Sequence, residues 1–401
     1  MAELTTVVAP ETALPRDGER AVLVGRAWRP DLEGPSVVTI RDGRVIDITS
    51  RAAPTVRDLL EQPDPAGFVR AVSGEDLGGL DALLANSDRT RRDPGRPWLL
   101  APMDLQALKA AGVTFVRSLL ERVIEEKARG NPALAEEIRR RLAQIIGTDL
   151  STIVPGSPEA ARVKEALVEK GAWSQYLEVG IGPDAEIFTK SQPMSAVGTG
   201  ADIGILRSSS WNNPEPEIVL VVDSRGRTVG ATLGNDVNLR DMEGRSALLL
   251  GKAKDNNGSC AIGPFIRLFD DGYGMDDVRR ETVMLTVEGP DNFRLEGSSS
   301  MAQISRDPED LVRAAIGPHH QYPDGFALFL GTMFAPVEDR DTPGQGFTHK
   351  PGDIVTIAAG RLGALVNRVG YADALEPWTF GAGHLMRNLA KRGLLSVSYT
   401  Q

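Results

Sequence analysis

Residues 211–222 read WNNPEPEIVLVV, and the rest of the chain is organised around this stretch. Its apolar end has the pattern of a strand, and Glu215 and Glu217 stand two positions apart at the start of that strand. Because residues i and i+2 of a strand point to the same face, both carboxylates are predicted to face one point. Pro214 and Pro216 alternate with the acids and stiffen the approach.

A second predicted strand brings a third acid to the same place. A turn at residues 224–226 leads into a strand-like run over residues 228–233, which ends in Gly234-Asn235-Asp236. A hairpin between the two strands would return Asp236 to the side of the two glutamates. Three carboxylates on neighbouring strands suit Mg²⁺ or Mn²⁺ better than zinc. The alternative for Glu-Pro-Glu before a strand is a solvated turn without a metal.

Several further motifs are spread over roughly residues 100–370. The motifs are Pro-Glu-Pro-Glu217-Ile, Gly234-Asn-Asp236-Val-Asn-Leu-Arg240-Asp241, Lys254 ahead of Gly263-Pro264, Gly331-Thr332, Lys350-Pro-Gly-Asp353 and Gly363-Ala-Leu-Val-Asn367. Together they resemble the fumarylacetoacetate hydrolase superfamily. This resemblance implies that Glu215, Glu217 and Asp236 bind a metal, Mg²⁺ or alternatively Mn²⁺, and that Lys254 is an active-site lysine.

The expected fold is α+β, with a mixed β-roll catalytic domain of this family's type over residues 171–401. Residues 1–97 are predicted to form a small α+β domain, interpreted as a structural cap or an oligomer surface. Residues 98–170 are predicted to be a helical segment, an insertion that leads into the catalytic domain.

The periodicity of the helical segment defines its expected elements. Residues 106–111 are predicted to form a helical turn or two. A helix over 116–129 has its apolar residues at the spacing of a core face. A second helix shows the same spacing at Leu134, Ile138, Leu142 and Ile145. A third helix is expected to begin at Ser157, a good N-cap.

The residues that select a reaction within the family lie ahead of the metal motif. Hydrolases of the superfamily carry a histidine and a glutamate spaced H-x-x-E, and the matching positions here are Ser118 and Glu121. Without the histidine, C–C hydrolysis lacks its general base. Glu121 is left as an acid of the site or an ordinary helix-surface charge. Glu186 matches the acid/base glutamate of sugar-acid dehydratases, and Lys190 matches a substrate-facing lysine; the alternative is a solvated strand pair.

The segment that contains Glu186 resembles bacterial 2-keto-3-deoxy-pentonate dehydratases, such as those acting on the D-xylonate or D-arabinonate derivative. The resemblance implies Mg²⁺-dependent loss of water from a small 2-keto sugar acid, giving 2,5-dioxopentanoate (2-oxoglutarate semialdehyde). Such a reaction belongs to non-phosphorylative pentose catabolism, the Weimberg pathway. Glu186 and Lys254 would be catalytic, with the order of their proton transfers open. Lys190, Thr332 and Ser118 would contact the substrate.

Two alternatives of different kinds stay open. One is an acylpyruvate or diketo-acid C–C hydrolase of the same superfamily. The other is a non-enzymatic binding protein for a small acid, which the three acids and the lysine disfavour.

The composition limits the partners. The 401 residues carry a net charge of −10, which disfavours binding to nucleic acid or to an anionic membrane. No apolar run reaches the ~20 residues of a membrane span. The single cysteine, Cys260, suits a reducing cytoplasm, as a buried hydrophobe or alternatively a reactive thiol. The resemblance also implies a homodimer or a dimer of dimers.

Overall fold

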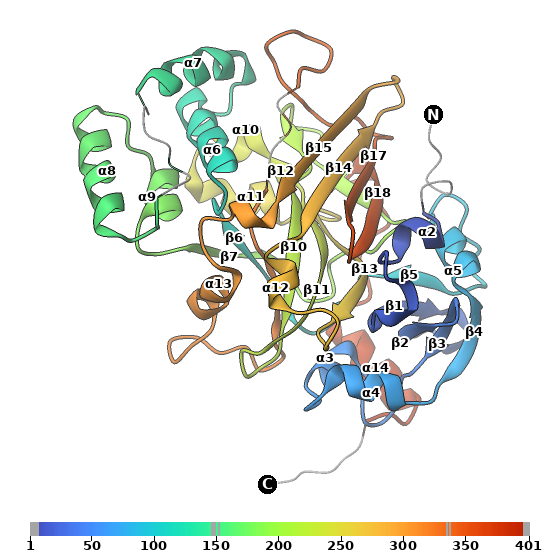
Figure 1. Ribbon diagram of the computed structural model, residues 1–401. Coiled ribbons are helices and arrows are strands. Elements are labelled where there is room, and N and C mark those ends of the chain that lie inside the picture. The colour runs from blue at the N-terminus through green and yellow to red at the C-terminus, as the bar shows by residue number, and fades with distance from the viewer. Residues whose placement is uncertain (1–7, 146–149, 151–152, 334–335, 337, 396–401) are drawn as a thin grey trace.

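The computed structural model describes residues 8–145, 150, 153–333, 336 and 338–395. Helices and strands mix along the chain, and distant parts of the sequence share sheets, so the α+β prediction is confirmed. The N-terminal strands and the helices between residues 116 and 181 lie on opposite sides of the long central strands (Figure 1).

An eleven-stranded sheet runs through the molecule. Its strands, in spatial order, are β4 (Glu75–Gly79), β3 (Arg44–Asp47), β2 (Gly34–Arg41), β1 (Leu23–Arg29), β13 (Cys260–Leu268), β11 (Thr228–Asp236), β10 (Pro216–Val222), β16 (Phe326–Phe329), β6 (Ala107–Gly112) and β7 (Glu186–Ser191), with β5 (Trp98–Leu100) paired to β1. All three predicted segments contribute strands, because β1 pairs with β13 and β6 pairs with β16. The boundaries at residues 97 and 170 stay predictions.

A second sheet packs beside the first. Its five strands, in spatial order, are β15 (Arg294–Ser300), β14 (Thr282–Glu288), β17 (Ile354–Ala359), β18 (Gly363–Tyr371) and β8 (Asp202–Ile205). Two short strands, β9 (Asn212–Asn213) and β12 (Asn238–Leu239), form a separate ladder.

The strand β10 is buried along its whole length. Ile218 and Leu220 belong to one hydrophobic cluster, and Val219 and Val221, on the opposite face, belong to another. A strand that is covered on both faces reads as an uninterrupted apolar run, which explains the sequence of this segment. The predicted hairpin is confirmed, since β10 and β11 pair in antiparallel fashion.

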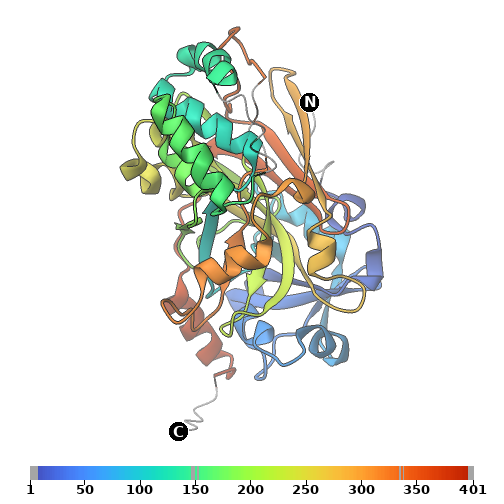
Figure 2. The same ribbon diagram turned by 60° about the vertical axis from the view of Figure 1, so that its left-hand side comes forward.

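The helices cover the two flanks of the sheets. On the N-terminal side lie α2 (Pro10–Ala13), α3 (Val56–Leu60), α4 (Pro65–Ala71), α5 (Leu80–Ser87) and the C-terminal α14 (Ala382–Lys391). On the other side lie α6 (Val116–Ala128), α7 (Ala135–Ile145), α8 (Pro158–Glu169) and α9 (Gln175–Ile181). The remaining α-helices of the described chain are α10 (Arg240–Glu243), α11 (Leu250–Lys254), α12 (Met275–Val278) and α13 (Pro308–Ala315). Figure 2 shows α6 to α9 gathered as one group. Among the described helices, none is both long and apolar enough to cross a lipid bilayer.

Two predictions for the helical segment are confirmed. The apolar face of α6 is buried, with Leu119 and Val123 in a cluster that also contains Leu177 of α9. Ser157 caps α8, because its side chain accepts a hydrogen bond from the backbone N–H of Ala160.

Two other predictions for this segment are wrong. Residues 106–111 do not form helical turns; most of them belong to the strand β6. The alanine-rich sequence favours a helix, but β6 pairs with β16 on one side and β7 on the other, and this pairing overrides the local propensity. Leu134 was expected in the core, yet it is 44% exposed, because it ends a short 3₁₀ helix (Pro132–Leu134) ahead of α7. The side chains of Leu142 and Ile145 lie outside the described part of the structure.

Candidate metal and substrate site

Three acids meet at the start of β10 and the end of β11. Ligand oxygens of Glu215, Glu217 and Asp236 all lie within 4.8 Å of one another, and the three residues are buried. The antiparallel register explains the meeting, because Glu217 pairs with Gly234, two residues before Asp236. A Cβ at Gly234 would lie 2.3 Å from a ring carbon of Phe329. Glycine at position 234 therefore lets the backbone of β11 lie this close to the Phe329 ring.

The backbone and neighbouring polar groups hold these carboxylates in place. The N–H of Glu215 donates to Asn235 Oδ1 at 3.0 Å, and the N–H of Asp236 donates to the Glu215 carbonyl at 3.0 Å. From the end of β16, the N–H of Gly331 donates to Glu217 Oε2 at 2.7 Å, and Thr332 Oγ1 donates to Glu215 Oε2 at 2.8 Å. Thr332 therefore lies in the cavity beside the acids.

Two lysines neutralise part of this charge. Lys254 Nζ lies 2.6 Å from Glu215 Oε2 and 3.0 Å from Asp236 Oδ2, and Lys190 Nζ lies 2.9 Å from Asp236 Oδ1. Burial acts to lower the pKa of Lys254, but the charges of Asp236 and Glu215 outweigh it and raise the pKa well above its ordinary value. Lys254 is therefore an ammonium group in this arrangement.

The donor set fits a hard dication. Burial, together with the nearby charges of Asp236 and Glu215, raises the pKa of Glu217 well above its ordinary range. Three buried carboxylates this close repel one another, and a dication would relieve the repulsion. Oxygen ligands from carboxylates are the preferred ligands of Mg²⁺. The three acids predicted from the sequence thus form a site that suits Mg²⁺, and Glu215, Glu217 and Asp236 are its candidate ligands.

Glu186 reaches the same cavity from β7. It is partly buried, and it pairs across the sheet with Gly112 of β6. A Cβ at Gly112 would lie 1.9 Å from Glu186 Oε2. The carboxylate of Glu186 therefore occupies space that a side chain at position 112 would fill. Burial, reinforced by the charge of Glu243, raises the pKa of Glu186 to about 7. Glu186 can therefore exchange a proton near neutral pH, as an acid–base residue must.

Lys190, which was predicted to face the substrate, is not among the residues that line the cavity. It is fully buried, and besides its ion pair with Asp236 it donates to the backbone carbonyl of Lys254. Glu186, Phe188 and Lys190 share one face of β7, and the first two line the cavity while Lys190 lies behind Asp236. A direct contact with substrate stays a prediction, and the observed contacts make Lys190 a support of Asp236.

The helix α6 supplies a further wall of the cavity. Ser118 lines the cavity and donates its hydroxyl to the Phe115 carbonyl at 3.0 Å. Glu121 points away and pairs with Arg139 at 2.9 Å and Arg240 at 3.1 Å. Its burial excludes the interpretation as an ordinary helix-surface charge. Arg139 and Arg240 balance the charge of Glu121 outside the cavity.

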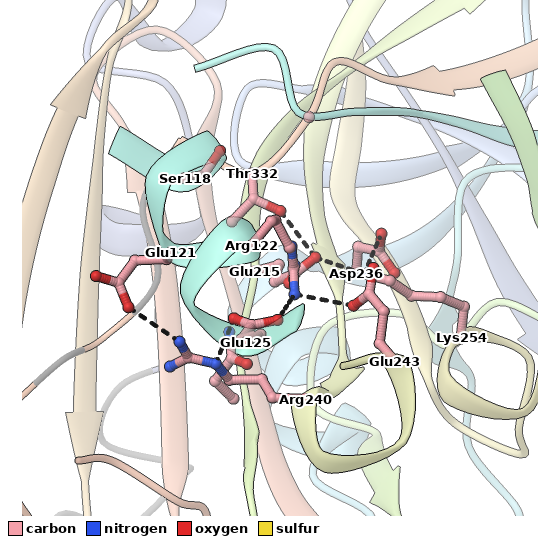
Figure 3. A network of polar contacts seen from close by, with 12 residues as sticks. Ser118, Glu121, Arg122, Glu125, Glu215, Asp236, Arg240, Glu243, Lys254 and Thr332 are labelled. Atoms are coloured by element: carbon pink, nitrogen blue, oxygen red, sulfur yellow. Dashed lines mark hydrogen bonds and ion pairs between the residues drawn. The ribbon is translucent and has the colours of Figure 1, made fainter. Parts of the chain in front are cut away.

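Two charged residues of the cavity were missed by the sequence analysis. Arg122 of α6 contacts Glu215, and its Nη1 lies 2.8 Å from Glu243 Oε2 (Figure 3). Burial acts to raise the pKa of Glu215, but the charges of Arg122 and Lys254 outweigh it and lower the pKa to about 2. A signal for Arg122 existed, since it follows Ser118 by four positions and so shares its helix face. Glu243 had no comparable signal.

The cavity brings most of the predicted site residues together. Its lining residues are Ala111, Gly112, Val113, Ser118, Arg122, Glu186, Phe188, Glu215, Glu217, Asp236, Glu243, Lys254 and Thr332. Among them are a metal-suited carboxylate cluster, an ammonium and a carboxyl group that titrates near neutrality. This combination can polarise a bound carbonyl compound and transfer protons to and from it.

Comparisons with known proteins all identify the same family. The model "Fumarylacetoacetate (FAA) hydrolase C-terminal" matches residues 164–370. A "Probable 2-keto-3-deoxyxylonate dehydratase" of Haloferax volcanii is 30% identical over 305 residues, which are 76% of this chain and 96% of the relative.

Two further matches agree. The 2-dehydro-3-deoxy-D-arabinonate dehydratase of Saccharolobus solfataricus is 34% identical over 187 residues, 46% of this chain and 58% of the relative. Among solved structures, "2-keto-3-deoxy-D-arabinonate dehydratase complexed with magnesium and 2,5-dioxopentanoate" aligns with a TM-score of 0.59 at 21% identity, covering 87% of this chain and 99% of that one. This structural match shows a shared fold. The chain belongs to the fumarylacetoacetate hydrolase family.

Proposed function

We propose that the protein is a hydro-lyase that uses Mg²⁺ to dehydrate a 2-keto-3-deoxy-pentonate to 2,5-dioxopentanoate. The observation that carries the proposal is the placement of Glu186, a carboxyl group whose pKa is raised to about 7, in one cavity with the three metal-suited acids. Both curated relatives are named as dehydratases of such acids, and the solved relative holds magnesium and 2,5-dioxopentanoate.

The residues divide the reaction between them. Glu215, Glu217 and Asp236 would hold Mg²⁺, which when bound would supply a Lewis acid next to the C2 carbonyl of the substrate and so make the C3 protons more acidic. Thr332 positions two of the carboxylates through its hydroxyl. Lys254, as an ammonium, balances their charge.

Proton transfer falls to Glu186 and Lys254. Loss of one C3 proton and of the C4 hydroxyl removes one water and leaves a double bond between C3 and C4. A proton shift from C5 to C3 then gives the C4–C5 enol, which tautomerises to the aldehyde. Protonated Glu186 is suited to assist the departure of the C4 hydroxyl, because its raised pKa leaves it partly protonated near neutral pH. Removal of the C3 proton by Lys254 requires that its ammonium first lose a proton, whereas ionised Glu186 is already a base. Variants of the two residues separate these routes.

The alternative reaction, C–C hydrolysis of an acylpyruvate or diketo acid, has less support. Ser118 replaces the histidine of the hydrolases, and Glu121 is bound to Arg139 and Arg240 outside the cavity. The cavity-lining residues include no histidine within the described chain.

A substrate screen tests the choice. Purified protein with Mg²⁺ would be offered 2-keto-3-deoxy-pentonates of both C4 configurations and, separately, an acylpyruvate, with products identified by mass. We expect loss of water from at least one pentonate. Cleavage of the acylpyruvate, with the pentonates unchanged, would replace the dehydratase assignment by the hydrolase one.

The assembly and location of the protein stay proposals as well. A homodimer or dimer of dimers is expected for this family, and light scattering at micromolar concentration that shows a monomer would contradict it. A cytoplasmic location and a role in non-phosphorylative pentose catabolism fit the proposed substrate. Cys260 is buried, and burial raises its pKa to about 12, which favours a packing role over a reactive thiol.

A further inference from the structure

Arg122 occupies an unusual position beside the metal-suited acids. Its side chain is buried, and its Nη2 contacts Glu215 Oε1. Its Nη1 lies 2.7 Å from Glu125 Oε2 and 2.8 Å from Glu243 Oε2 (Figure 3). One end of the guanidinium thus faces a predicted metal ligand, while the other end is held by two carboxylates that do not belong to the metal cluster.

The held end of Arg122 is anchored in a chain of ion pairs. Glu125 Oε1 accepts a hydrogen bond from Arg240 Nε at 2.7 Å, and Arg240 continues to Glu121 at 3.1 Å. The guanidinium of Arg240 also lies 4.3 Å above the ring of Trp211. Because Glu125 is fixed from both sides, the Nη1 end of Arg122 has a stable position, and the Nη2 end is the part free to change partners.

The two oxygens of Glu215 face different neighbours. Oε2 accepts from Lys254 Nζ at 2.6 Å and from Thr332 Oγ1 at 2.8 Å, whereas Oε1 contacts Arg122. A dication bound by Glu215 repels a guanidinium on the same carboxylate. The contact between Arg122 and Glu215 therefore suits the metal-free protein, and Nη2 needs another acceptor once the site is loaded.

We propose that Arg122 is a substrate-binding residue whose Nη2 passes from Glu215 to the carboxylate of the bound 2-keto acid. The proposal rests on the substrate class given under the proposed function. The carboxylate is the one full negative charge of such a substrate, and a guanidinium matches it in charge and shape. Arg122 lies within hydrogen-bonding reach of a metal ligand, so it borders the metal-bound end of the substrate rather than the distal hydroxyls.

If Arg122 has this role, removing its guanidinium should raise the affinity for Mg²⁺ and lower the affinity for a 2-keto acid anion. Arg122→Met should bind Mg²⁺ alone about 3- to 10-fold more tightly, because a competing cation is lost. The same variant should bind pyruvate, the smallest 2-keto acid, about 10- to 100-fold more weakly at saturating Mg²⁺, because a charged hydrogen bond is lost. A residue that only supported the fold would weaken both.

The experiment measures Mg²⁺ by calorimetry and pyruvate by ligand-observed NMR. Arg139→Met is the matched control, since Arg139 belongs to the same chain of ion pairs through Glu121 but lies outside the cavity lining. The control should leave both affinities within about threefold of the wild type. Arg122→Lys, which keeps the charge, should recover part of the pyruvate affinity and serves as the test if Arg122→Met does not fold.

The outcomes separate the proposals. Unchanged pyruvate affinity in Arg122→Met, or a parallel loss of Mg²⁺ and pyruvate binding, would overturn the role of Arg122. Neither measurement depends on turnover. If Arg122 binds pyruvate as described but the wild type leaves 2-keto-3-deoxy-pentonates unchanged, the proposed function fails and the assignment of Arg122 stands.

Discussion

The cavity has two walls that are held in different ways. The strand wall carries Glu215, Glu217 and Asp236, which the paired backbones of β10 and β11 position. The helix wall carries Arg122 of α6 and Glu243 of α10, which ion pairs position. Like charges crowd on the strand wall, whereas opposite charges alternate on the helix wall.

The contrast indicates that the two walls of the cavity have different functions. Carboxylates held by a sheet keep their spacing even when they repel one another, as a metal site requires. Side chains held by ion pairs can exchange partners when a ligand brings a new charge. The strand wall is thus expected to determine metal binding, and the helix wall the response to the substrate anion.

Removing a charge from the strand wall should have the largest effect. Glu215→Gln, Glu217→Gln and Asp236→Asn should each weaken Mg²⁺ binding and abolish measurable turnover, because an amide is a poorer ligand for a hard dication. Calorimetry with Mg²⁺ and an assay of product formation check this. Circular dichroism should show an intact fold, and full activity in chelator-treated wild type would contradict the metal requirement.

The two proton-transfer residues should separate the steps of the reaction. Glu186→Gln should keep Mg²⁺ binding and lose about 10²–10⁴-fold in turnover, the usual contribution of a positioned acid or base. Lys254→Met should lose dehydration together with exchange of the C3 protons into deuterated water. Proton NMR of the substrate measures the exchange. Exchange that survives in Glu186→Gln assigns the first proton to Lys254, and unaltered turnover in that variant would remove Glu186 from the mechanism.

A matched pair of neutralising variants compares the walls in the metal-free protein. Glu125→Gln should lower the free energy of unfolding by about 3 kcal/mol, because Arg122 and Arg240 lose a buried anion. Glu217→Gln should leave the stability unchanged or raised, because burial and the nearby acids already disfavour the charged form of Glu217, and glutamine resembles its neutral form. Denaturant titration with chelator present measures both. Equal losses in the two variants would contradict the contrast between the walls.

The pH dependence of stability gives the smallest effect. The pKa of Glu186 is raised from 4.5 to about 7, so the folded protein holds a proton that the unfolded chain releases. The stability contributed by neutral Glu186 is complete below about pH 4 and is lost as the pH rises to about 7, an effect on the order of 1–3 kcal/mol. Comparing metal-free wild type with Glu186→Gln isolates it. A difference between them that does not change over this range would contradict the raised pKa.

The sequence determined the strand wall far better than the helix wall. Alternation along a strand and a hairpin turn are local rules, and they correctly brought Glu215, Glu217 and Asp236 together. The position of Lys254 followed from the family resemblance. Arg122 and Glu243 are far apart in the chain. Their ion pair forms only when α6 and α10 pack together.

Two further differences have physical causes. The strand β6 was missed because an alanine-rich segment favours a helix until two neighbouring strands bind it. Lys190 was predicted to face the substrate, and strand alternation does place it on the face of Glu186. The alternation pattern does not reveal that the ammonium group of Lys190 pairs with Asp236 and donates to the backbone carbonyl of Lys254.

Metal-dependent dehydration can be tested by comparing Mg²⁺-loaded and chelator-treated wild-type protein on a 2-keto-3-deoxy-pentonate. The products would be followed by mass, and an aldehyde reagent would detect 2,5-dioxopentanoate. We expect a product that is lighter by one water and carries an aldehyde, formed only when Mg²⁺ is present. An unchanged substrate, a product of C–C cleavage, or equal conversion without metal would contradict this expectation.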